Sequence, residues 1–267
     1  MAELFFLFPT FSTSLSLTLP NNFDPYLPEL PVDAHKSSRG VVGVIAGSEN
    51  YPGAAVLSVG GARRGGAGYV KYFSQYTFPT QLVLQAYPDV VPISDLESEK
   101  CDAWVIGSGA PEIARVPKAP ILVLDGSALS LTNIVHEGIT IITPHEGEAE
   151  KLGYLVKNRK ETALKMARDL NVIVVLKGPG TIVATPDGFL EVDKIGGIEL
   201  ASAGTGDILA GLMASMMAAW RPTNFEDAAK IALKSIKAHG LAGKLAAEKS
   251  HPVVATDVLR ALPKVLR

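Results

Sequence analysis

The chain has 267 residues, of which 47% are hydrophobic and 19% are charged. This composition supplies enough apolar side chains for a large core and excludes a mainly disordered chain. The chain carries 25 Lys and Arg against 27 Asp and Glu, so its net charge is −2. That balance gives no electrostatic reason to expect nucleic acid or an anionic membrane as a partner. The single cysteine, Cys101, excludes an internal disulfide and any zinc site built from several cysteines. We expect it to be a buried structural thiol.

The N-terminal 33 residues are predicted to be an extension that precedes a single domain at residues 34–267. No Lys or Arg occurs before Lys36, so the extension lacks the basic region of a secretory signal. The longest apolar segment, residues 208–220, is shorter than the roughly 20 residues that a spanning helix needs. We therefore expect a cytoplasmic protein whose extension packs on the domain or reflects a start site placed too early.

Short apolar runs rich in β-branched residues or Leu predict the strands of a buried parallel sheet. These runs lie at residues 41–45, 69–73, 103–106, 121–124, 139–142 and 172–176. Helical patterns lie at residues 53–64, 147–155, 160–170, 206–220, 225–248 and 256–266. A short hairpin is predicted around residues 186–188. This order predicts one α/β domain with a mostly parallel sheet.

Polar or glycine-rich residues follow five of the predicted strands. They occupy residues 46–48, 107–109, 125–126, 143–148 and 177–180. The carboxyl ends of parallel strands gather along one edge of a sheet, where ligands bind. A single such loop could be only a tight turn, but five together predict one binding crevice.

Residues 204–207, Gly-Thr-Gly-Asp, open the predicted helix at 206–220. Glycines let the backbone approach an anion, and the helix directs N–H groups and its positive dipole end at that anion. Thr205 adds a hydroxyl donor. Asp207 is either a carboxylate that favours the helix start or a general base that takes a proton from a hydroxyl as phosphate arrives.

Residues 177–181, Lys-Gly-Pro-Gly-Thr, follow another strand. They match neither the Walker A motif nor the dinucleotide-binding glycine fingerprint. Their backbone could wrap a nucleotide while Lys177 meets a phosphate. The alternative is a glycine turn with a solvated lysine.

Two further segments could contact a ligand. In residues 143–148, Thr143 or His145 could donate a hydrogen bond, although His145 could also cap or pack the helix that follows. Glu148 is best explained by the helix dipole. One histidine beside carboxylates does not make a zinc site, so no protein-borne metal site is predicted. In residues 51–55, small side chains allow either close ligand approach or tight packing.

Together these residues resemble the ribokinase-like superfamily and, within it, the NAD(P)H-hydrate dehydratase family, from about residue 34 to the C-terminus. The resemblance rests on the order and spacing of residues 35–36, 46–48, 53–55, 64–68, 107–109, 143–148, 177–181 and 204–207. It implies a ribokinase-like α/β fold with helices on both faces of the sheet. It also implies a repair lyase that uses ADP or ATP, with Mg²⁺, to dehydrate the S epimer of hydrated NADH or NADPH. Such enzymes phosphorylate the hydroxyl of the hydrate and then release phosphate. A homo-oligomer, with a tetramer as one form, is a further expectation from the family.

The resemblance also implies roles for individual residues. Asp207 would be the base, and Gly204, Thr205 and Gly206 would form an anion hole for the transferred phosphoryl group. The adenine nucleotide would bind to Lys177, Gly178, Pro179, Gly180, Thr181 and Gly206. The hydrated dinucleotide would contact Ala54, Gly109, His145 and Asp207.

The chain departs from the family at three places. Residues 107–111 stand where the family has Gly-Pro-Gly-Leu-Gly, and a helix that usually follows is expected to be short or absent. Residues 125–130 stand where the family has Asp-Ala-Asp-Ala-Leu-Asn, and residues 195–201 lack an Asn-Pro pair. Two alternatives therefore stay open: a kinase for a vitamin-precursor alcohol, and a nucleotide-binding protein without catalysis.

Overall fold

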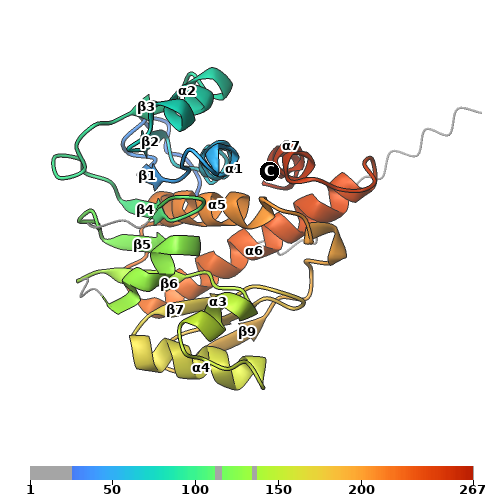
Figure 1. Ribbon diagram of the computed structural model, residues 1–267. Coiled ribbons are helices and arrows are strands. Elements are labelled where there is room, and N and C mark those ends of the chain that lie inside the picture. The colour runs from blue at the N-terminus through green and yellow to red at the C-terminus, as the bar shows by residue number, and fades with distance from the viewer. Residues whose placement is uncertain (1–25, 112–115, 134–136, 267) are drawn as a thin grey trace, which may run out of the picture.

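A central sheet organises the computed structural model, which describes residues 26–111, 116–133 and 137–266. Within these residues nine strands form one sheet in the order β3-β2-β1-β4-β5-β6-β7-β8-β9 (Figure 1). The strands are β1 Val41–Ile45, β2 Tyr69–Phe73, β3 Val91–Pro92, β4 Ala103–Ile106, β5 Ile121–Leu124, β6 Ile139–Ile142, β7 Ile173–Leu176, β8 Ile182–Ala184 and β9 Leu190–Val192.

The strands from β3 to β7 are parallel, and β8 and β9 join the sheet antiparallel. Every residue of β4, β5, β6 and β7 is buried, because helices cover both faces of a parallel sheet. This explains why these strands are almost entirely apolar in the sequence, with Thr140 the one polar residue. The carboxyl ends of all five strands β1 and β4 to β7 therefore lie along one edge.

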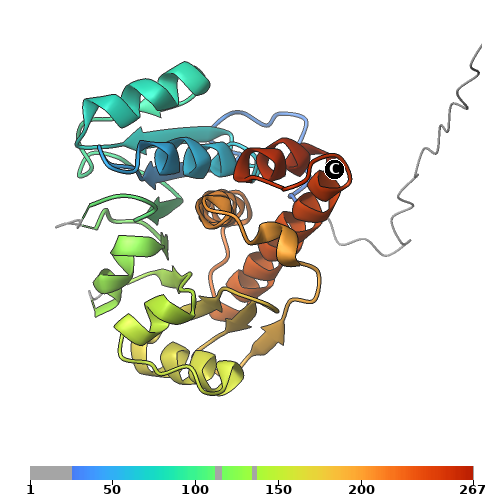
Figure 2. The same cartoon turned by 45° about the vertical axis from the view of Figure 1, so that its right-hand side comes forward.

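Helices cover the two faces of the sheet unequally. On one face lie α1 (Pro52–Ala62), α5 (Thr205–Trp220), α6 (Phe225–Ala247) and α7 (Ala255–Val265), with α2 (Thr77–Ala86) packed against α1. On the other face lie η1 (Gly126–Asn133), α3 (Glu146–Lys151) and α4 (Arg159–Leu170). Figure 2 looks nearly along α5, which packs against both α1 and α6. The helix α5 is thus central to one face, and its N-terminus points to the edge of the sheet where the carboxyl ends of the strands lie.

Two glycines let α1 and α5 approach closely. A Cβ atom on Gly211 would lie 1.9 Å from the carbonyl oxygen of Ser58, and one on Gly61 would lie 2.2 Å from that of Ile208. Only hydrogen fits at these two positions. The contact fixes α5, and with it residues 204–207, relative to the loop after β1.

The predicted strands and the hairpin are confirmed, as is the α/β fold with a mostly parallel sheet and helices on both faces. The predicted helix at 147–155 is too long, because α3 ends at Lys151 and Gly153 then adopts φ +90°. The helix α2 and the strand β3 were not predicted. Only Pro79 and Val83 of α2 are buried, so its sequence carries almost no amphipathic pattern. The described residues between β4 and β5, 107–111 and 116–120, contain no helix, as expected.

The start of the described chain packs on the domain. Tyr26 is buried, and its carbonyl oxygen accepts a 3.0 Å hydrogen bond from Nε1 of Trp220. Most of the predicted extension at residues 1–33 lies outside the described residues. Cys101 is buried as predicted, and burial raises the pKa of its thiol to about 12. Among the described helices, none is both long and apolar enough to cross a membrane.

Candidate active site

The loops after five parallel strands are linked to one another by backbone hydrogen bonds. The N–H of Gly47 after β1 donates to the carbonyl of Ser108 after β4, at 2.8 Å. The N–H of Thr143 after β6 donates to Leu124, the last residue of β5, at 3.0 Å. The N–H of Lys177 after β7 donates to Pro144 at 2.8 Å. The strand ends therefore form one continuous edge, as predicted.

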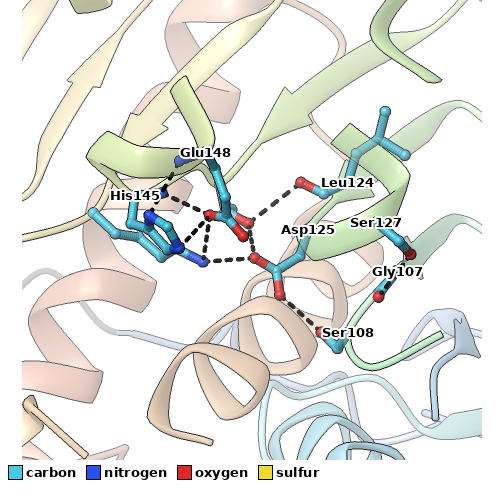
Figure 3. Close-up of polar contacts among 9 residues, drawn as sticks. Gly107, Ser108, Leu124, Asp125, Ser127, His145 and Glu148 are labelled. Atoms are coloured by element: carbon cyan, nitrogen blue, oxygen red, sulfur yellow. Dashed lines mark hydrogen bonds and ion pairs between the residues drawn. The ribbon is translucent and has the colours of Figure 1, made fainter. Parts of the chain in front are cut away.

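Asp125 lies at the centre of this edge, where it directly follows β5. Its Oδ2 accepts a 3.0 Å hydrogen bond from the hydroxyl of Ser108, and its Oδ1 accepts one of 2.7 Å from the hydroxyl of Thr143. Lys177 Nζ lies 2.7 Å from the same Oδ1. Figure 3 shows Asp125 between Ser108 and the loop that carries His145 and Glu148. Because Thr143 is buried and bonded to Asp125, its hydroxyl is not directed at a ligand.

Lys177 reaches from the end of β7 into the same cluster. Its Nζ is 3.8 Å from Oε2 of Glu148, and a Cβ atom on Gly206 would lie 3.5 Å from it. Burial lowers the pKa of Lys177, but Asp125, Glu148 and Asp207 outweigh burial and raise it above its ordinary value. The alternative of a solvated lysine is therefore wrong: Lys177 is a mostly buried, paired cation beside the first turn of α5.

Asp207 lies in that first turn and faces the cluster. Burial is the largest cause that raises the pKa of its carboxyl to about 7, and the charge of Asp125 raises it further. The charge of Lys177 and the hydroxyl of Ser108 act in the opposite direction. A carboxylate with a pKa near 7 is suited to accept a proton at neutral pH. This strong shift favours the base over a simple helix-start carboxylate.

The N-terminus of α5 forms the floor of the site. Gly204 adopts φ +89°, and a Cβ atom there would lie 2.3 Å from Cδ1 of Leu57, so glycine is required. The first N–H groups of a helix have no partner inside it and point outward, which makes this end an anion site. The hydroxyl of Thr205, however, donates to the carbonyls of Leu200 and Ser202 at 2.8 and 2.9 Å. Its predicted use as a donor to phosphate is therefore wrong, and Thr205 can serve the anion hole only through its backbone.

The loop of residues 177–181 is held by an arginine that sequence reasoning missed. Arg159, at the start of α4, donates to the carbonyls of Leu176, Lys177 and Gly180 at 3.1–3.2 Å and also to that of Pro179. Its Nε lies 3.0 Å from Oε1 of Glu146. The guanidinium thus fixes three carbonyls of the predicted nucleotide loop and that of Leu176, which ends β7. No pattern near residue 159 distinguishes it from a helix-start arginine.

His145 has the capping role that was one of the two open for it. Its Nδ1 accepts a 3.2 Å hydrogen bond from the N–H of Glu148, and Oε2 of Glu148 accepts one of 2.8 Å from the N–H of His145. This capping box starts α3. The side chain of His145 is nevertheless 58% exposed, so it is also accessible to a ligand beside Glu148 and Lys177.

Ala54 and Gly109, both predicted to contact the dinucleotide, meet at the other side of the site. A Cβ atom on Gly109, which adopts φ +61°, would lie 2.5 Å from Cβ of Ala54. Gly109 follows Ser108, whose hydroxyl is bonded to Asp125, so this contact adjoins the Asp125 cluster. The predicted site residues thus form a connected series from Ala54 to His145, with Ser108, Asp125 and Arg159 added by the structure.

No group of three or more His, Cys, Asp or Glu side chains suited to a metal occurs in the described part of the chain. Binding of a magnesium nucleotide is compatible with this arrangement, because the ion can be held through phosphates and water. The chain itself offers the α5 N-terminus and a buried lysine, which are the groups that phosphates require.

Comparisons with a family model and with known proteins agree on one family. A family model described as NAD(P)H-hydrate dehydratase matches residues 42–264. The ADP-dependent (S)-NAD(P)H-hydrate dehydratase of Bacillus subtilis is 31% identical over 90% of this chain and 93% of its own length. The bifunctional NAD(P)H-hydrate repair enzyme Nnr of Thermofilum pendens is 31% identical over 90% of this chain. The chain spans only 52% of that longer relative.

Two solved structures are also similar to this chain. A crystal structure of ADP/ATP-dependent NAD(P)H-hydrate dehydratase from Bacillus subtilis, co-crystallized with ATP/Mg²⁺, has a TM-score of 0.79 at 30% identity. The match covers 90% of this chain and 93% of that one. A ribokinase-like superfamily protein from Enterococcus faecalis has the same TM-score at 23% identity, which supports the ribokinase-like fold alone. It covers 90% of this chain and 91% of its own.

Proposed function

The chain belongs to the NAD(P)H-hydrate dehydratase family, and on that premise we propose that it is a repair lyase. It dehydrates the S epimer of hydrated NADH or NADPH and uses ADP or ATP as the phosphoryl donor. The single observation that carries the proposal is the position and pKa of the Asp207 carboxyl. This carboxyl lies in the first turn of α5, beside the mostly buried Lys177, with a pKa of about 7.

In the proposed reaction Asp207 takes the proton of the substrate hydroxyl. The oxygen then accepts the terminal phosphoryl group of the nucleotide, and ADP or AMP leaves. In the second step phosphate leaves with the C–O bond electrons, and the neighbouring ring carbon loses a proton to solvent, which restores the ring double bond. The backbone of Gly204, Thr205 and Gly206 faces the transferred group, and Lys177 supplies a fixed positive charge next to Gly206. Positioning and charge stabilisation of this kind dominate phosphoryl transfer.

The nucleotide would occupy the loop of residues 177–181, which Arg159 holds in place. Mg²⁺, when bound to the phosphates, neutralises charge on them during transfer. Lys177, because it pairs with Asp125, serves the phosphoryl group rather than the adenosine. The hydrated ring would lie between the Ala54–Gly109 contact and Asp207, with His145 at the far rim.

The proposal is tested by turnover of the purified chain with Mg²⁺, hydrated NADH, and either ADP or ATP. We expect reduced-nicotinamide absorbance to return with at least one nucleotide, and the Asp207→Asn variant to lose roughly 10²–10⁴-fold in kcat while its nucleotide affinity is retained. A stable phosphate ester as product would instead identify a small-molecule kinase. Nucleotide binding without turnover in either variant would identify a binding protein.

Three finer expectations accompany the proposal. A homo-oligomer, with a tetramer as one form, is expected from the family and is checked by light scattering coupled to gel filtration. A cytoplasmic location and a domain that begins near residue 34 also stay predictions. A chain that starts at residue 34 but keeps full activity and stability would support that domain boundary.

A further inference from the structure

A turn at residues 107–110 is held by the hydroxyl of Ser127, which comes from the loop after β5. The N–H of Ala110 donates to the carbonyl of Gly107 at 3.0 Å and closes the turn. The Ser127 hydroxyl donates to the carbonyl of Ala110 at 2.8 Å and lies 3.2 Å from that of Gly107. Figure 3 shows Ser127 beside Gly107. Ser127 therefore lies against both ends of the turn.

The same turn places Gly109 against the start of α1. Gly109 adopts φ +61°, and a Cβ atom there would lie 2.5 Å from Cβ of Ala54 and 2.9 Å from that of Tyr51. The fit leaves no room for a side chain, so a small displacement of the turn changes the Gly109–Ala54 contact. Both residues are proposed contacts of the hydrated dinucleotide. Because Ala110 follows Gly109 in the chain, the hydrogen bond from Ser127 acts directly on this contact.

Ser127 is separate from the groups proposed for the chemical step. It is exposed, and within the described part of the chain its hydroxyl reaches carbonyls of residues 107–111 rather than the charged side chains of the Asp125 cluster. The predicted nucleotide loop at residues 177–181 is held by Arg159, on a different element. Loss of the Ser127 hydroxyl therefore removes support from the turn and leaves these other groups in place.

The chemistry of Ser127 matches the turn that it supports. The carbonyl oxygens of Gly107, Ala110 and Pro111 lie within 3.5 Å of its hydroxyl oxygen, so this position requires a proton donor. The family has aspartate where this chain has Ser127, and an ionised carboxylate can only accept hydrogen bonds. The two segments in which the chain departs from the family, residues 107–111 and 125–130, are thus in contact and complement each other.

We propose that Ser127 is a positioning residue that sets the affinity for the hydrated dinucleotide. Its hydroxyl holds the turn at residues 107–110, and the turn holds Gly109 against Ala54 on the side of the site where the hydrated ring would lie. The inference rests on the proposed function. It predicts that Ser127 acts on binding of the dinucleotide and not on binding of the adenine nucleotide.

The test combines steady-state kinetics of the full chain, with hydrated NADH and the nucleotide that supports turnover, and isothermal titration of that nucleotide. In Ser127→Ala we expect KM for hydrated NADH to rise roughly three- to tenfold, as the loss of one neutral hydrogen bond implies, while kcat and the Kd for the nucleotide change by less than about twofold. Ser127→Thr keeps the hydroxyl and should restore KM. Ser127→Asp replaces the donor by an acceptor and should raise KM at least as much as Ser127→Ala does.

Ser130→Ala is the matched control. Ser130 lies on the same element, η1, but its hydroxyl donates to the carbonyl of Ser127 at 2.9 Å, so its loss should leave KM for hydrated NADH unchanged. An unchanged KM in folded Ser127→Ala and Ser127→Asp, or an equal loss of nucleotide affinity, would overturn the inference and leave the proposed function intact. A wild-type chain without turnover would instead overturn the proposed function, and the inference with it.

Discussion

Lys177 Nζ lies 2.7 Å from Oδ1 of Asp125, although 52 residues separate them in the chain. Both side chains are mostly buried, with 18% of Lys177 and 6% of Asp125 exposed. Burial alone would lower the pKa of Lys177, yet Asp125, Glu148 and Asp207 together raise it. Asp125 therefore holds Lys177 in its protonated form next to Gly206, at the start of α5.

Replacement of Lys177 by methionine should destabilise the protein strongly. The change leaves Asp125 buried without its cation, which typically costs about 3–5 kcal/mol in the free energy of unfolding. Urea unfolding measures this loss. The double variant Lys177→Met/Asp125→Asn should recover part of it, because the uncompensated charge is gone.

Lys165→Met is the matched control for that experiment. Lys165 pairs with Asp169 on the surface of α4, with 68% and 41% of the two side chains exposed. Surface pairs contribute roughly 0–1 kcal/mol, so this variant should unfold nearly as the wild type does. Equal losses in the two variants would contradict a special role for the buried pair.

At high pH the Asp207→Asn variant should be more stable than the wild type. The pKa of Asp207 is about 7 in the folded chain against an ordinary 3.8. Between these values the folded chain holds a proton that the unfolded chain has lost, so the free energy of unfolding falls as the pH rises. Asparagine does not titrate, and the variant should gain roughly 2–4 kcal/mol at pH 8 and less than half of that at pH 5. Thermal unfolding at both pH values checks this; a gain independent of pH would contradict the raised pKa.

The strands and the anion-binding helix could be predicted from the sequence because their signals are local. The strands β4 to β7 are buried on both faces and so are almost entirely apolar, and glycines mark the start of α5. The hairpin of β8 and β9 was predicted from its turn residues.

The features that could not be predicted depend mostly on contacts between distant parts of the chain. Nothing in residues 177–181 indicates that Lys177 is paired with Asp125, or that Arg159 holds their carbonyls. The hydroxyl of Thr205 is used by Leu200 and Ser202, which spacing cannot indicate. The helix α2 buries only two residues, so its amphipathic pattern is weak.

Arg159→Lys should weaken nucleotide binding more than it slows the chemical step. Lysine cannot reproduce the forked donors that reach the carbonyls of residues 176–180. The loop should then lose its fixed shape, and we expect the Kd for ADP to rise about tenfold while kcat at saturation changes less. Isothermal titration measures the Kd. Arg168→Lys is the control, since Arg168 is on the same helix but lies beside Gly188 in the β8–β9 turn; an equal loss there would point to α4 as a whole.

Gly211→Ala should disturb the anion site from a distance. The added Cβ atom would lie 1.9 Å from the carbonyl oxygen of Ser58 in α1. Both groups belong to helix backbones, so the helices themselves must separate. We expect a loss of at least about 2–3 kcal/mol in the free energy of unfolding and a higher KM for the nucleotide, because α5 carries residues 204–207.

Gly53→Ala is the control in α1: a Cβ atom there meets nothing within 4 Å, and alanine is the better helix former by roughly 1 kcal/mol. Gly53→Ala should therefore leave stability unchanged or raise it. If Gly211→Ala unfolds like the wild type, the close approach of α1 and α5 does not fix the anion site.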